Sequence, residues 1–208
     1  MPLVKMNKMG RESAWALWFI AESEQELAFE AMESYPEDII SPQKRLEWLS
    51  VRVLIKTLTE LSGLDYVGLR KDEFGKPYLK EHEHQISLSH SFPYVAAQIH
   101  PAKAVGIDVE QPKEKLLKVA HRVLSSGEIK DAGENIVKHC VYWCAKEAMY
   151  KIYGKRGLHF ESQLNLDPFR LQSFGELRGY INADNLTNEI SLGYTVQFDY
   201  VMVYTKFY

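Results

Sequence analysis

Asp108 and Glu110 lie one residue apart in the stretch Gly106-Ile107-Asp108-Val109-Glu110, which is otherwise typical of a buried strand. Because side chains alternate along a strand, both carboxylates project from the same face. Two carboxylates on one face repel each other, and burying them without positive charge is unfavourable. A divalent cation relieves this cost, and carboxylate oxygens suit Mg²⁺. The pattern is compatible with a magnesium site, but a lone Asp-x-Glu is more often a strand end that faces solvent.

A second chemical pattern lies in a segment with the period of a helix, 134–153. Trp143, Glu147 and Lys151 follow one another at intervals of four residues and therefore share one helical face. One interpretation is an ordinary surface Glu–Lys pair, which stabilises a helix by about 0.2–0.5 kcal/mol. The functional alternative makes Glu147 a third metal ligand or a base, with Lys151 beside it to stabilise phosphate charge.

Two further segments contain residues suited to binding an anion. In the turn Gly75-Lys76-Pro77, Gly permits close backbone approach and Pro stiffens the chain, so Lys76 can be held over a phosphate or a base ring. In the segment 87–91, the alternation of a strand would direct the three serines to one side and His90 to the other. A hydroxyl-rich loop beside a histidine could equally cradle phosphate. The alternatives are a plain turn and a structural histidine.

These residues require regular elements to position them, and capping signals indicate where the helices begin. Ser23 with Glu26 and Ser125 with Glu128 form capping-box patterns, and Ser41-Pro42 is typical of a helix start. We expect helices from about Ser23 to Ser34, from Ser41 to Leu61 and from Glu134 to Tyr153. We expect strands at 14–20 and 104–110, short strands and turns over 64–100, and a β-rich segment after Gly154.

Four short patterns recur about 100 residues later in the same order, as expected after a duplication. The recurring pairs are Trp48…Lys56 with Trp143…Lys151, Phe74-Gly75 with Phe174-Gly175, Ile86-Ser87-Leu88 with Ile190-Ser191-Leu192, and Tyr94-Val95 with Tyr200-Val201. This predicts an α+β fold of two similar halves in a pseudo-two-fold arrangement, 1–103 and 104–208. Each half would be a long helix packed on an antiparallel sheet, and a site is expected in the cleft between the halves.

Composition restricts the class of protein further. The 208 residues carry a net charge of −3 and are 46% hydrophobic and 12% aromatic, which excludes a disordered or collagen-like chain. The near-neutral charge suggests neither nucleic acid nor an anionic membrane as partner. The longest apolar runs fall short of the ~20 residues that cross a bilayer, and we expect a cytoplasmic protein. Cys140 and Cys144 are expected to be reduced and buried.

Taken together, the order of these motifs resembles one family. A G-K-P turn, an S-H-S loop, a G-I-D-V-E strand and a W-x-x-K-E-x-x-x-K helix, in that order, resemble the 4′-phosphopantetheinyl transferase superfamily, most closely its surfactin-synthetase-activating type. The resemblance implies a holo-[acyl-carrier-protein] synthase type enzyme. It would move the phosphopantetheine arm of coenzyme A to a serine of an acyl or peptidyl carrier protein and release 3′,5′-ADP.

The resemblance also implies roles for individual residues. Asp108, Glu110 and Glu147 would bind Mg²⁺, or alternatively Mn²⁺, and Glu147 would accept the serine proton directly or through a metal-bound water. Lys151 would stabilise charge on the transferring phosphate or the leaving group. Residues implied to bind coenzyme A are Arg45 at the 3′-phosphate, the backbone of Gly75, Lys76 and Pro77 at the adenine, and Ser89, His90 and Lys146 at the phosphates.

The carrier partner is expected to be acidic, and a basic segment follows the Asp108/Glu110 strand. This segment contains Lys113, Lys115, Lys118, His121 and Arg122, although a solvated helix face is the alternative. We expect a monomer. Two other functions stay open: a non-catalytic module that binds coenzyme A or a carrier protein, and a metal-dependent phosphotransferase acting on a small molecule. The sequence lacks a G-x-x-x-x-G-K-[ST] loop, which disfavours a nucleoside triphosphate donor.

Overall fold

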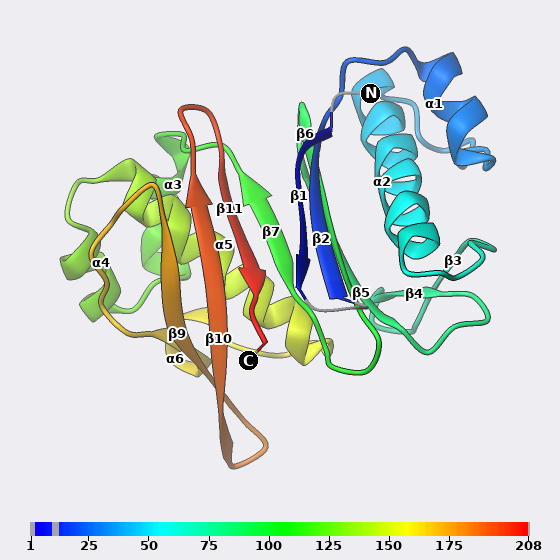
Figure 1. The fold of residues 1–208 in the computed structure, drawn as a ribbon. Coiled ribbons are helices and arrows are strands. Elements are labelled where there is room, and N and C mark those ends of the chain that lie inside the picture. The colour runs from blue at the N-terminus through cyan, green and yellow to red at the C-terminus, as the bar shows by residue number, and fades with distance from the viewer. Residues whose placement is uncertain (1–2, 10–12, 208) are drawn as a thin grey trace. The chain divides into compact units, whose positions relative to one another are not determined.

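The computed structural model describes residues 3–9 and 13–207 as an α+β protein (Figure 1). Its contacts divide the chain into two compact units, Met1–Val105 and Gly106–Tyr208. Within the described ranges, no helix combines the length and the apolar character that crossing a bilayer would require.

The first unit is an antiparallel sheet with a long helix on one face (Figure 1). Its strands are β1 (Leu3–Met9), β2 (Ser13–Phe19), β5 (Gln85–Ser91) and β6 (Tyr94–His100), in the order β1-β2-β6-β5. Its helices are α1 (Glu24–Ala31) and α2 (Pro42–Leu61), and β3 (Leu69–Lys71) pairs with β4 (Pro77–Leu79) as a separate hairpin. Leu49, Leu54 and Leu58 of α2 are fully buried in one apolar cluster with Val95 and Ile99 of β6.

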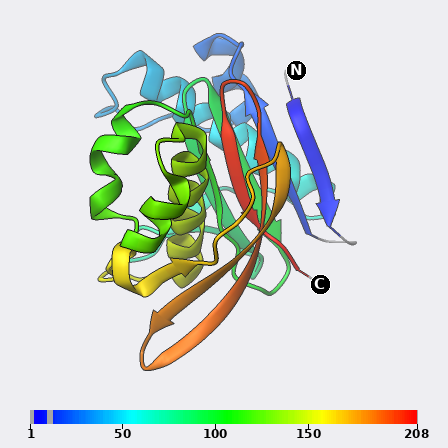
Figure 2. The same cartoon turned by 90° about the vertical axis from the view of Figure 1, so that its left-hand side faces the viewer.

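The second unit repeats this plan with a longer sheet. Its strands are β7 (Ile107–Glu110), β8 (Leu164–Leu166), β9 (Phe174–Ala183), β10 (Leu186–Val196) and β11 (Val201–Thr205), in the order β7-β11-β10-β9-β8. Its helices are α3 (Lys115–Val119), the 3₁₀ turn Ala120–Arg122, α4 (Ser126–Ala132), α5 (Ile136–Tyr153) and α6 (Phe160–Gln163). Figure 2 shows the green helices of this unit together on one side of its red and orange strands. The long helix α5 packs on β7 and β11.

Helix boundaries follow the capping chemistry that the sequence predicts. Both capping boxes form: the Ser23 backbone N–H donates to Glu26 Oε2 at 2.8 Å, and that of Ser125 donates to Glu128 Oε2 at 2.7 Å. Ser41 caps α2 at its N-terminus with Pro at the first helical position. Gly154 ends α5 in the left-handed conformation, φ 71°, which glycine adopts without steric cost.

Two boundaries differ from prediction. The helix expected to reach Ser34 ends at Ala31, because Met32 turns left-handed at φ 54°. The strand expected from residue 104 begins at Ile107. The S-H-S segment lies within β5, where Ser89 pairs with Ala96 and His90 with Val95 along β6. Its strand alternation, which directs the serines to one side and His90 to the other, is confirmed, and a loop is not formed here.

Candidate functional site

The helix α5 lies unusually close to the backbone around β7, and a glycine makes this possible. A Cβ at Gly106 would lie 2.0 Å from the carbonyl oxygen of Ala148, far inside contact distance. Across the sheet, a Cβ at Gly179 would lie 2.4 Å from the sulfur of Met149. The approach at Gly106 brings side chains of α5 to the strand that carries the Asp-x-Glu motif, and the approach at Gly179 holds α5 on β9.

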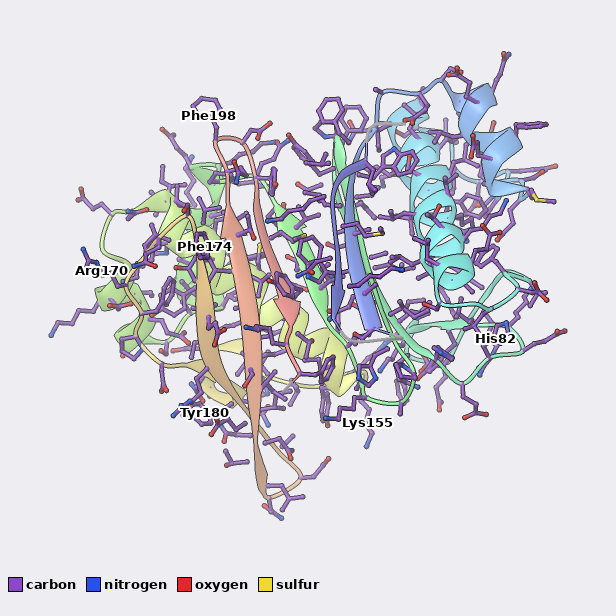
Figure 3. All side chains as sticks on the ribbon, viewed as in Figure 1. His82, Lys155, Arg170, Phe174, Tyr180 and Phe198 are labelled. Atoms are coloured by element: carbon purple, nitrogen blue, oxygen red, sulfur yellow. The ribbon has the colours of Figure 1, made fainter. Side chains whose placement is uncertain are left out.

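Asp108 and Lys151 form the central contact of this region. The Lys151 ammonium lies 2.8 Å from Asp108 Oδ1 and also donates to the backbone carbonyl of Ile107 at 2.8 Å. Asp108 is buried, whereas 27% of the Lys151 side-chain surface is exposed to solvent. Lys155, labelled in Figure 3, follows α5 and marks the end of the helix near which Lys151 lies. Lys151 therefore belongs to a site on β7 and is not simply a surface partner of Glu147.

Glu147 completes an acidic cluster with Asp108 and Glu110. The pKa of Glu147 is raised from 4.5 to about 7, mainly by burial. The Asp108 charge is the next contribution to this rise, the Lys151 ammonium opposes it, and Glu110 adds a smaller increase. Burial also raises the pKa of the Cys144 thiol, with contributions from both carboxylates of β7. The structure thus brings three carboxylates and one ammonium within electrostatic range.

The donor chemistry of this cluster fits a hard divalent cation. The cluster has three carboxylates and one lysine, and carboxylate oxygens are the ligands that such cations prefer. Within the part of the chain that the structure describes, no three His, Cys, Asp or Glu side chains converge closely enough to hold a metal ion as they stand. The Lys151 ammonium holds one oxygen of Asp108 instead. A metal ion would require a rearrangement of this ion pair.

Lys146 precedes Glu147 but lies on another face of α5, fully buried. Its ammonium contacts Glu128 Oε2 at 2.6 Å and donates to the carbonyls of Val123 at 2.8 Å and Phe160 at 3.0 Å. These partners use all three ammonium protons. The predicted phosphate contact of Lys146 would require breaking this set, so the observed placement is a structural one.

The Gly75-Lys76-Pro77 turn connects β3 with β4 and is organised by one carboxylate. Asp72 Oδ1 accepts hydrogen bonds from the backbone N–H groups of Phe74 and Lys76, each at 2.9 Å. Gly75 has φ +88°, a conformation that disfavours side chains. Burial lowers the pKa of Lys76, and the Asp72 charge opposes this effect. The turn is therefore a rigid platform with a half-buried lysine.

His90 lies on β5 with its ring more than half exposed and contacts α2. Its Nδ1 is 3.2 Å from Glu47 Oε2, while the Gln43 amide donates to Glu47 Oε1 at 3.0 Å. Ser89, the neighbour of His90, is buried, as alternation along a strand requires. Only His90 of this predicted pair is well exposed.

Arg45 lies on the face of α2 that packs against α1. Its Nε donates to Glu24 Oε2 at 2.9 Å, and one terminal nitrogen donates to the carbonyl of Ile40 at 2.8 Å. The guanidinium also lies over the Tyr35 ring, 5.3 Å from its centroid. Arg45 and Glu47 are two positions apart on α2 and therefore project to opposite sides of the helix. The described contacts do not bring Arg45 and His90 together.

Several partners of the predicted site residues were not identified from the sequence. Glu24, Glu47 and Glu128 each bind a predicted site residue, namely Arg45, His90 and Lys146. A sequence signal exists for Glu47, because it lies among apolar residues of α2 where a carboxylate must find a partner. Glu24 carries no such signal, since its contact depends on how α1 packs on α2.

The comparison with protein families agrees with this geometry. Residues 104–204 match the model of a class of group-transfer enzymes, and this segment contains the acidic cluster with Lys151. The matched model is that of the 4′-phosphopantetheinyl transferase superfamily, so residues 104–204 are identified as a segment of this superfamily. A search of curated proteins found no match.

Proposed function

We propose that the chain transfers the 4′-phosphopantetheine arm of coenzyme A to a serine of an acyl or peptidyl carrier protein, in a Mg²⁺-dependent reaction that releases 3′,5′-ADP. The family match of residues 104–204 supports transfer of this group. The observation that carries the proposal is the acidic cluster of Asp108, Glu110 and Glu147 beside Lys151. Such a cluster suits phosphoryl transfer, which depends on neutralising charge and positioning the reacting groups.

The residues of the second unit have distinct proposed tasks. Asp108, Glu110 and Glu147 would hold Mg²⁺, which when bound neutralises charge on the pyrophosphate of coenzyme A. Glu147 would accept the proton of the attacking serine hydroxyl, directly or through a metal-bound water. The serine oxygen forms the new bond to phosphorus as the bond to 3′,5′-ADP breaks. Lys151 would stabilise the charge on the departing phosphate.

The first unit would contribute to coenzyme A binding. Arg45 would contact the 3′-phosphate, for which its planar guanidinium is suited, and it would exchange Glu24 for this anion. The backbone of the Gly75-Lys76-Pro77 turn would contact the adenine. His90 would contact the phosphates, whereas the side chain of Ser89 is buried on the other face of β5. We propose for Lys146 a structural role, since its partners are a buried carboxylate and two carbonyls.

The basic segment after β7 is the proposed docking surface for the carrier protein. Its exposed cations are Lys113, Lys115, Lys118, His121 and Arg122, and the partly exposed side chain of Leu117 lies among them. This basic segment would mainly raise the association rate of an acidic partner. That increase in rate should become smaller as the salt concentration rises.

A transfer assay separates this proposal from a non-catalytic binding module. Purified chain, coenzyme A, Mg²⁺ and a panel of carrier proteins should release 3′,5′-ADP in equal amount to the modified carrier. Asp108→Asn should abolish release, while Glu134→Gln, which neutralises an exposed carboxylate of the same unit, should not. Binding of coenzyme A or carrier without release would instead establish a binding module.

A further inference from the structure

Glu47 is a buried carboxylate on α2 whose two oxygens have different partners. Only 8% of the Glu47 side-chain surface is exposed to solvent. Oε1 accepts a hydrogen bond from the Gln43 amide at 3.0 Å, and Oε2 lies 3.2 Å from Nδ1 of His90. A buried carboxylate needs such donors, and the histidine is the ionisable one.

The carboxylate determines which ring nitrogen of His90 is available to a ligand. An ionised carboxylate only accepts hydrogen bonds, so a hydrogen bond from His90 to Glu47 through Nδ1 requires the proton on that nitrogen. The other nitrogen, Nε2, is then the atom left for a second anion, on a ring that is 55% exposed. A ring that donates to a carboxylate and to a phosphate at once carries both protons, and it bridges the two anions.

The surroundings of His90 single out Glu47 as its charged partner. The register partner of His90 on β6 is the apolar Val95. In β4, which packs against β5, the ionisable side chain is Tyr78, whose hydroxyl donates to Asp72 at 3.3 Å. On β5 itself, the neighbours of His90 are serines.

We infer that Glu47 is a positioning residue that orients His90 so that its Nε2–H binds a phosphate of coenzyme A. This inference rests on the proposed function for the identity of the ligand. Glu47 does not touch the ligand. It holds the ring and keeps the proton on Nδ1, and its effect on binding passes through His90.

Direct binding of coenzyme A tests this chain of contacts without requiring transfer. Calorimetry with Glu47→Gln should show a Kd for coenzyme A about tenfold weaker than wild type, as expected when a charge-assisted hydrogen bond is lost. Glu60→Gln removes an exposed carboxylate from the same helix and should leave the Kd unchanged. In a His90→Ala background, Glu47→Gln should add no further loss, because its effect passes through the ring.

Nitrogen NMR of the His90 ring gives a second readout that needs no variant to fold. In the wild-type chain Nδ1 should be protonated, and coenzyme A should bring Nε2 to the protonated shift as well. An unprotonated Nδ1, an unchanged Kd in Glu47→Gln, or an equal loss with and without His90 would each overturn the inference. A chain that binds coenzyme A in this way but transfers nothing would instead refute the proposed function alone.

Discussion

The metal-free chain should lose stability as pH rises, because Glu147 is forced to ionise inside the acidic cluster. Its pKa is 4.5 when unperturbed and about 7 in the folded chain. The folded state therefore binds this proton more tightly than the unfolded state does. The resulting stabilisation is fully present below pH 4.5 and is lost as pH rises through about 7.

The size of this loss follows from the shift in pKa. A change from 4.5 to about 7 corresponds to about 3 kcal/mol at 1.36 kcal/mol per pKa unit. Glu147→Gln cannot ionise, so it should match wild type near pH 4.5 and exceed its free energy of unfolding by about 3 kcal/mol at pH 8. Mg²⁺ should shrink this difference at pH 8 by stabilising the folded wild-type chain.

Urea unfolding in EDTA, measured at intervals between pH 4.5 and pH 8, checks this expectation. Glu134→Gln is the matched control, because it removes an exposed carboxylate from the same unit and should follow wild type throughout. A difference between Glu147→Gln and wild type that does not depend on pH would refute the reasoning. So would a Glu147→Gln chain that is less stable than wild type at pH 8.

Two further predictions concern how α5 is held. Lys146→Met should lower the free energy of unfolding by about 3–5 kcal/mol, because it leaves the buried Glu128 without its charge partner. Lys146→Met combined with Glu128→Gln should be the milder change, and urea unfolding of both chains checks this. Gly106→Ala should cost at least about 1–3 kcal/mol, because its methyl group meets the Ala148 carbonyl. Thermal melts of both variants check this, with Gly127→Ala as the control because its added methyl group has space. Equally small losses of stability in the two variants would contradict the prediction.

Local chemistry made the helices predictable from the sequence. Ser41-Pro42 and the Ser125–Glu128 box act within one turn of helix, so their signals are complete in a few residues. The end of α1 was not predictable in this way, because Met32 adopts a left-handed conformation that its residue type does not favour. The strand character of the S-H-S segment depends on β6, which lies beyond the local pattern.

The recurring sequence patterns were only partly informative about structure. Trp48…Lys56 and Trp143…Lys151 both lie in the long helices α2 and α5. In contrast, Phe74-Gly75 lies in a turn whereas Phe174-Gly175 begins the strand β9. Residues 86–88 and 190–192 both lie in strands, β5 and β10, and the two Tyr-Val pairs lie at the starts of β6 and β11. The Phe-Gly pair is therefore the one recurring pattern of the four that falls in unlike elements.

The candidate site shows the same limit. The spacing of Glu147 and Lys151 predicts that they share one face of the helix and that Lys146 lies on another. The sequence does not predict which carboxylate pairs with each lysine. Asp108 binds Lys151 and Glu128 binds Lys146, and these pairings depend on how β7 and α4 pack on α5.

The intact mass of a carrier protein tests the central claim most directly. Incubated with the chain, coenzyme A and Mg²⁺, an acyl or peptidyl carrier should gain the mass of one phosphopantetheine arm. The same carrier with its acceptor serine replaced by alanine should gain none, and Glu147→Gln should leave the normal carrier unmodified. A carrier panel that gains no mass with the wild-type chain, or gains it equally with Glu147→Gln, would contradict the account.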